Sequence, residues 1–314
     1  MYEKLKVTLA MLFTMVFWGI SFIWSEQALS IYNPFTVVLF RLIISVVILL
    51  VLNIFLRRIN KIKKSDIVSF FLLSFLQPFA YFVAENYGIV YTDATTTSVV
   101  IATIPLFSPI AAYFFLKERV NLINIIGIII SIIGVFLVLI KDDLTLTTSL
   151  EGLLILFGAV VAAVLYSVLV SKLSTKHSVY TLTVYQNLFG IIWFLPMFFI
   201  FDFSEFVSIG FQADAFISIA LLAVFGSTIC FLFFIYGVKV LGITRANIFG
   251  NSIPVFTAIF AFFIMGTTFI YINILGIILV TLGVTVTQIK KDTARKISSA
   301  ILSKKYLSRI FPKS

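Results

Sequence analysis

Charge is scarce in this sequence. Asp, Glu, Lys and Arg together make up 11% of its 314 residues, against about 25% in an ordinary soluble domain. Apolar residues reach 61%, compared with about 45–50% in soluble proteins. This composition excludes an ordinary globular core and predicts a polytopic helical membrane protein.

The residues that build most catalytic and metal sites are also rare. The chain has one histidine, His177, and one cysteine, Cys230, so a zinc site, a Ser-His-Asp triad and a disulfide framework are excluded on inventory. The sequence also lacks a Gly-x-x-x-x-Gly-Lys-Ser/Thr loop for a nucleotide phosphate. We therefore expect no enzyme activity, no metal and no cofactor, and the movement of a solute remains to be considered.

Long apolar runs, by contrast, are abundant. A helix needs about 20 apolar residues to cross a hydrocarbon layer of ~30 Å, and helices are favoured because lipid cannot satisfy exposed backbone groups. The sequence predicts an all-α integral membrane protein with ten transmembrane helices, near residues 7–25, 34–56, 67–90, 95–116, 122–140, 152–171, 180–201, 213–238, 246–265 and 271–289.

The second half of the chain repeats the first at a distance of 149 residues. Tyr-Gly at 87–88 recurs at 236–237, and Ile-Asn-Ile-x-Gly-Ile-Ile at 123–129 recurs at 272–278. Each half holds five apolar runs, and an odd number of crossings inverts the half that follows. We predict two inverted five-helix repeats, at residues 1–140 and 151–290. An extracytoplasmic linker at residues 141–150 joins them, and a basic cytoplasmic tail follows at residues 291–314.

The net charge of +10 could indicate nucleic-acid binding, but the distribution of the charges removes that support. In a ten-crossing arrangement almost all lysines and arginines fall on one side, including the cluster at 57–64 and the tail from Lys290. Acidic residues such as Asp93 and Asp202 lie in or beside the loops of the other side. Basic loops stay in the cytoplasm, so both the N- and the C-terminus are predicted to be cytoplasmic.

Two ionisable residues, Arg41 and Glu85, lie within predicted spans. Their distances from Pro34 and Asp93 place both roughly 10–12 Å below the outer surface, at ~1.5 Å per residue. They could form a buried ion pair that orients two helices, because such pairs are commonly structural. Alternatively, Arg41 binds a substrate carboxylate or Glu85 carries a proton in a coupling step. Under either interpretation both side chains face inward, since charge at membrane depth is costly.

Uncharged polar and aromatic residues cluster at a comparable depth. Pro105 and its repeat image Pro254 are predicted to break or kink two matching helices, and paired breaks of this kind indicate a binding region. The alternative is that the Asn and Ser side chains only join helices by hydrogen bonds worth ~0.6 kcal/mol each. The candidate site residues are Trp18, Gln77, Tyr81, Asn86, Thr97, Ser98, Tyr166, Gln186, Asn187, Asn247 and Asn251.

Glycines recur seven residues apart on the fifth and tenth runs. Gly127 and Gly134, with their images Gly276 and Gly283, each lie on one helix face, and small residues there allow close helix approach. These runs are therefore predicted to be packing or dimer helices rather than cavity walls, in a monomer or a weak homodimer.

Several motifs, in their order along the chain, resemble those of the EamA family of the drug/metabolite transporter superfamily. They are Phe17-Trp18-Gly19-Ile20-Ser21-Phe22, Phe40-Arg41, Tyr87-Gly88 with Ala94 and Ser98, and the stretch from Pro105 through Lys117-Glu118-Arg119 to Gly134. The resemblance implies ten helices in two inverted halves around a central cavity, in a bacterial inner membrane. It also implies transport of small metabolites, often export of amino acids or related compounds.

The leading hypothesis is a secondary transporter that moves a small amphipathic metabolite by alternating access between its halves, as efflux. Its expected partners are the small-molecule substrate, membrane lipid and a proton used in coupling. An uptake permease of the same fold is the nearest alternative, because the sequence does not encode direction. A non-transporting membrane subunit or a lipid-handling protein is disfavoured, because a scaffold gains little from buried charge.

Single cysteines should report the predicted topology. The asymmetry of lysine and arginine places residues 59–64 and 300–314 in the cytoplasm and residues 144–149 outside. An impermeant maleimide added to intact cells should therefore label position 144 and leave position 60 unlabelled until the membrane is opened. Labelling of both positions from the same side would contradict the ten-crossing arrangement.

Overall fold

The computed structural model describes residues 2–116, 122–138 and 149–287, and all regular secondary structure in these ranges is helical. The predicted tail and most of the predicted linker lie outside the described residues. The helices of the first half, together with the short 3-10 and π-helical turns (η) that continue them, are α1 (Tyr2–Leu29), α2 (Pro34–Leu56), η1 (Lys64–Asp66), α3 (Ile67–Ser74), η2 (Phe75–Ala80), α4 (Tyr81–Tyr91), α5 (Ala94–Ile101), α6 (Ile104–Leu116) and α7 (Leu122–Val138).

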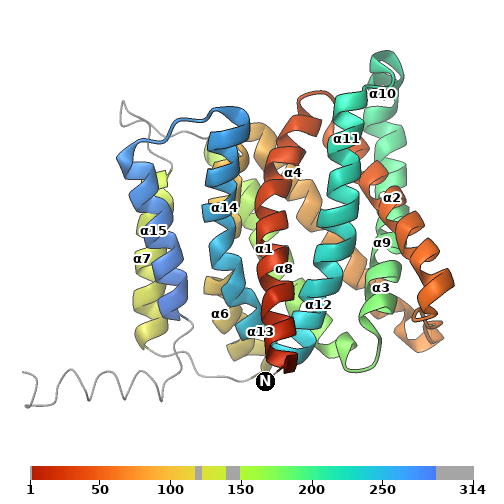
Figure 1. Cartoon of the computed structure of the whole chain (residues 1–314), viewed down its shortest axis with the longest axis horizontal. Helices are drawn as coiled ribbons and strands as arrows, with labels where there is room; N and C mark the ends of the chain where they lie inside the picture. Colours follow the sequence, from red (N-terminus) through yellow and green to blue (C-terminus); the bar gives the residue numbers. More distant parts are fainter. Residues whose placement is uncertain (1, 117–121, 139–148, 288–314) are drawn as a thin grey trace, which may run out of the picture.

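The second half is also helical throughout its described residues. It consists of α8 (Leu150–Ser174), α9 (Val179–Met197), η3 (Phe198–Asp202), α10 (Phe203–Ile209), α11 (Ala213–Leu221), η4 (Leu222–Ile229), α12 (Cys230–Leu241), α13 (Ile243–Phe249), η5 (Gly250–Ser252), α14 (Ile253–Phe260), η6 (Ala261–Met265) and α15 (Tyr271–Thr287). The helices form one bundle, with α1 in its middle and α7 and α15 at one edge (Figure 1).

Six helical stretches among the described residues are long and apolar enough to cross a membrane: Leu5–Leu29, Pro34–Leu56, Lys64–Tyr91, Leu150–Ser174, Val179–Ile209 and Ala213–Leu241. Shorter apolar helices cover Ala94–Ser108, Gly250–Met265 and Tyr271–Gly283. The chain is therefore a multi-pass helical membrane protein, and helices suit it because each satisfies its own backbone hydrogen bonds where lipid offers none.

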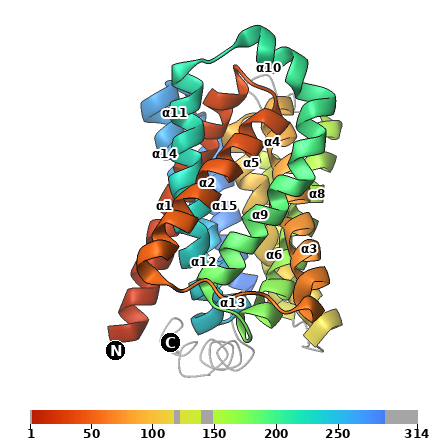
Figure 2. The same cartoon turned by 90° about the vertical axis from the view of Figure 1, so that its right-hand side faces the viewer.

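The helices α2 and α9, which correspond across the 149-residue shift, run antiparallel to each other. The start of α2 meets the end of the α9 stretch, where the Thr36 amide donates to Asp202 Oδ2 at 2.7 Å. At the opposite end of the same pair, the Asn60 amide donates to Thr181 Oγ1 at 3.0 Å. Figure 2 shows the segment that follows α2 crossing the lower end of the bundle on its way to α3. The two contacts fix opposite directions for α2 and α9.

The pair α7 and α15 packs backbone to backbone through the repeated glycines. A Cβ at Gly276 would lie 2.7 Å from the Gly134 carbonyl oxygen and 2.8 Å from the Val138 amide nitrogen. A Cβ at Gly283 would lie 2.7 Å from the Gly127 carbonyl oxygen. The predicted packing role of these helices is thus met within one chain, because small residues let two backbones approach this closely.

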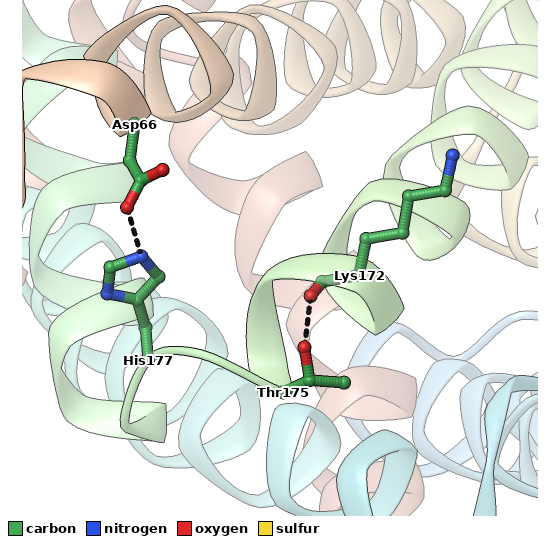
Figure 3. Close-up of polar contacts among 4 residues, drawn as sticks. All are labelled: Asp66, Lys172, Thr175 and His177. Carbon is green, nitrogen blue, oxygen red and sulfur yellow. Dashed lines mark hydrogen bonds and ion pairs between the residues drawn. The ribbon is translucent and has the colours of Figure 1, made fainter.

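The two ends of the bundle are held by different contacts. At the upper end in Figure 1, the Tyr32 hydroxyl donates to the Gly210 carbonyl at 2.7 Å beside an apolar cluster. This upper cluster comprises Trp24, Ala28, Tyr32, Val37, Ala215, Ile219 and Leu222. At the lower end, His177 Nε2 and Asp66 Oδ2 lie 3.1 Å apart, and Figure 3 shows Lys172 turned away from this pair. Each end therefore ties the first half to the second.

Substitution of Gly276 tests the close packing of α7 and α15. Gly276→Leu should lower the free energy of unfolding by about 1–3 kcal/mol, because the side chain would overlap backbone atoms that cannot rotate away. Gly158→Leu is the matched control, since no atom lies within 4 Å of a Cβ at that position. Thermal unfolding of both purified variants in detergent measures the difference, and equal midpoints would contradict the packing argument.

Candidate functional site

The strongest site candidate is a cavity of about 80 Å³ among α1, α2, the α4 and α12 helices and the interrupted helices α5–α6 and α13–α14. Its apolar walls include Phe22, Phe82, Phe231 and Phe234. The polar side chains that line it are Trp18, Ser21, Arg41, Gln77, Tyr81, Glu85, Ser167 and Asn247. An apolar cavity with a few convergent polar groups is the usual form of a small-molecule site.

Arg41 is the cation of this cavity and is 2% exposed. Its Nε donates to Ser227 Oγ at 2.5 Å, and its guanidinium carbon lies 4.0 Å from the centre of the Phe82 ring. A Cβ at Gly226 would lie 2.9 Å from an Nη nitrogen of Arg41. The glycine therefore leaves the space that the guanidinium occupies.

Glu85 is the anion of the same cavity and is 7% exposed. The Tyr81 hydroxyl, one turn earlier on α4, donates to Glu85 Oε1 at 2.7 Å. Among the described residues, the basic nitrogen and acidic oxygen found within 4.0 Å of each other belong to His177 and Asp66. Arg41 and Glu85 thus face one cavity without the direct ion pair considered from the sequence.

A first pair of helix irregularities borders Arg41 and Glu85. Gln77, which lines the cavity, has an extended backbone inside η2, with φ −151° and ψ 120°. Its image across the repeat, Gly226, lies in the π-helical turn η4. The carbonyl oxygen of Gly226 accepts from Trp18 Nε1 at 3.3 Å. Matching π-helical turns are common at functional sites, and here both lie beside the cavity.

A second pair of irregularities precedes the two prolines. The helix is interrupted at residues 102–103 between α5 and α6, and Pro105 follows in the first turn of α6. In the second half η5 interrupts the helix, and Pro254 follows in the first turn of α14. Proline suits a first turn, because its missing N–H would have no helical acceptor there. Pro105 lines the cavity directly, together with Gly250 of η5.

Seven candidate residues lie outside the cavity lining, and four of them bond to a neighbouring helix. Tyr166 donates to Gln186 Oε1 at 2.8 Å, and Asn187 donates to the Ser227 carbonyl at 3.2 Å. The others bond to a nearby carbonyl or to a threonine hydroxyl. These seven are Asn86, Thr97, Ser98, Tyr166, Gln186, Asn187 and Asn251. Pro254 likewise does not line the cavity, although its neighbour Ile253 does.

Two serines of the lining were not singled out as site residues by the sequence analysis. Ser21 donates to the Trp18 carbonyl at 2.8 Å and Ser167 to the Ala163 carbonyl at 2.9 Å. Ser21 follows Trp18 by three residues, so helical spacing alone places both on one face. Ser167 carries no comparable signal, because the adjacent Tyr166 was the more conspicuous polar residue.

The polar groups of the cavity lie among apolar walls. Among the described residues no group of three His, Cys, Asp or Glu side chains could hold a metal ion. A model of the EamA-like transporter family matches residues 5–140 and 150–288. The chain belongs to this family. It is therefore a membrane transporter and not an enzyme.

Other EamA-like transporters are similar along most of their length. YetK of Bacillus subtilis (strain 168), an uncharacterized transporter, is 28% identical over 80% of this chain and 76% of its own. YyaM of the same strain, also an uncharacterized transporter, is 25% identical over 90% of this chain and 93% of its own. A crystal structure with 14% identity has a TM-score of 0.70, covering 94% of this chain and 99% of that one. The last likeness shows the fold alone.

Removal of the Ser227 hydroxyl tests whether it holds Arg41. Ser227→Ala should lower the free energy of unfolding by about 1.5–3 kcal/mol, because hydrogen bonds to charged groups contribute that much. Ser252→Ala is the control, since that hydroxyl bonds only to the Phe249 carbonyl of its own turn. Denaturant or thermal unfolding in detergent compares the two. A Ser227→Ala variant no less stable than the control would contradict this role.

Proposed function

We infer that this chain is a secondary transporter that moves a small amphipathic metabolite across the bacterial inner membrane. We further propose that the chain crosses the membrane ten times in two inverted repeats and that both termini are cytoplasmic. The antiparallel courses of α2 and α9, and of α7 and α15, support the inversion. The concentration of basic residues at the end where α2 finishes supports the orientation.

The size of the cavity supports a mechanism in which the helices around it move. A volume of about 80 Å³ accommodates a few water molecules, at about 30 Å³ each, whereas ligand pockets span about 300–1,000 Å³. A metabolite therefore enters only when the helices around the cavity separate. The contacts at both ends of the bundle join the two halves, so alternating access requires that one set opens while the other holds.

The matched irregular turns are the proposed points of movement. Helix turns that lack the regular hydrogen-bond ladder bend more readily than α-helix, and they occur at Gln77, in η4, at residues 102–103 and in η5. All four lie on interrupted helices that border the cavity. A change of angle at one matched pair would widen the cavity toward one side.

The positive charge of Arg41 is the observation from which we propose a substrate with a carboxylate. Its guanidinium faces the cavity with a serine as its hydrogen-bond partner and no carboxylate within ion-pair distance among the described residues. Guanidinium groups bind carboxylates through paired hydrogen bonds, so a substrate carboxylate would neutralise it. Trp18 and Phe234, with ring centres 5.1 Å apart, provide an apolar surface. An amino acid or a related amphipathic compound fits both features.

Glu85 is the proposed partner for a positive charge. It would bind the ammonium group of a zwitterionic substrate or carry a proton during coupling, because a carboxyl group can take up and release a proton. We propose export as the direction, in keeping with what the family resemblance implies. Uptake remains the alternative that an oriented assay distinguishes.

Transport by paired variants tests the roles of Arg41 and Glu85. Purified protein in liposomes loaded with labelled amino acids should release label, and the double variant Arg41→Met, Glu85→Gln should fold but release none. Glu85→Gln alone should flatten the pH dependence of transport, because an amide cannot titrate. Gly158→Ala, at an open lipid-facing position, is the activity control. A fully active, pH-responsive double variant would overturn the assignment.

A further inference from the structure

A second concave site lies at the lower end of the bundle, away from the central cavity. It is a groove of about 790 Å³ between the end of α2, the start of α9 and the end of α12. No residue that lines it also lines the central cavity. Because α2 belongs to the first half and α9 and α12 to the second, the groove spans the junction of the halves.

Three cations surround this lower groove: Arg57, Arg58 and Lys239. All three are exposed, and none forms an ion pair with a carboxylate of the described residues. Arg58 lies over the Tyr180 ring at 5.6 Å, and its carbonyl accepts from Ser178 Oγ at 2.9 Å. Three cations therefore gather at the groove with no carboxylate of the described residues in ion-pair contact.

The backbone adds to the positive potential of the groove. Ser178 and Val179, at the first turn of the 19-residue helix α9, line it. The Ser178 hydroxyl caps this helix by accepting from the Thr181 amide at 3.1 Å. The first-turn amides of a helix carry partial positive charge and attract anions. Side chains and backbone thus favour the same kind of ligand.

The groove also has an apolar wall that continues toward lipid. Leu232, Phe233 and Val240 line it, and Phe55, just before Arg57, is 79% exposed. Tyr180 and Tyr236 lie at the same level, and tyrosine is enriched where hydrocarbon meets headgroups. A small soluble anion would leave this apolar wall exposed, whereas the acyl chain of a lipid would pack against it.

We propose that the lower groove binds an anionic phospholipid, with its phosphate between Arg57, Arg58 and Lys239 and its acyl chain against Phe233 and Val240. Basic pockets between transmembrane helices recognise anionic headgroups in this way. The occupant is distinct from the transported metabolite. It bridges the two halves at the end where they meet.

Native mass spectrometry of the delipidated full-length protein tests the proposal. Phosphatidylglycerol and phosphatidylcholine with identical chains are compared, and wild type should bind the first more tightly. The triple variant Arg57→Gln, Arg58→Gln, Lys239→Gln should bind phosphatidylglycerol about a hundredfold more weakly, at about fivefold for each basic residue. The charge-matched control Lys61→Gln, Lys63→Gln, Lys64→Gln, outside the groove lining, should keep the wild-type preference.

Two further measurements keep the result decisive. If the triple variant does not fold, Lys239→Gln and Arg58→Gln alone should each weaken binding about fivefold. Inorganic phosphate at millimolar concentration should not displace the lipid. Equal binding of both lipids by wild type, an unchanged preference in the groove variants, or displacement by inorganic phosphate would each overturn the proposal.

Discussion

The hydrocarbon interior of a membrane supplies no hydrogen-bond partners, and this constraint governs the structure. It favours helices throughout the described chain, and it makes irregular backbone tolerable only where side chains replace the missing bonds. The turn at η4 meets this condition, because Trp18 and Asn187 donate to the carbonyls of Gly226 and Ser227. The four matched irregular turns, at Gln77, in η4, at residues 102–103 and in η5, lie on helices that border the cavity.

Much of the fold could be predicted because length and apolarity are recorded locally in the sequence. The boundaries of α2 agree with the predicted run 34–56, since Pro34 and the charged residues after Leu56 mark both ends. The helix interruptions near Pro105 and Pro254 were also anticipated, although the breaks begin two to four residues earlier. Proline disturbs the turn that precedes it, so its position indicates the break only approximately.

The site was harder to predict, because sequence position along a span gives depth but not direction. Arg41 and Glu85 share a depth, yet Arg41 bonds to Ser227 of a distant helix and Glu85 to Tyr81 of its own. The same limit explains why Asn86 and Ser98 bond to carbonyls of their own helices rather than line the cavity. Which face a residue occupies depends on long-range packing, and one sequence alone does not contain that information.

The repeat makes the two ends of the molecule comparable residue by residue, and they differ in chemistry. Subtracting 149 from His177 gives Ala28, and adding 149 to Asp66 gives Ala215; both alanines lie in the upper apolar cluster. The lower contact is thus a polar one between His177 and Asp66, and its counterpart is apolar. Dissolved ions screen the charge of a carboxylate, whereas an apolar contact depends on the surface removed from water, so the two ends respond differently to the solution. The strength of the contacts that join the two halves at each end is in this sense a property of the solution as well as of the chain.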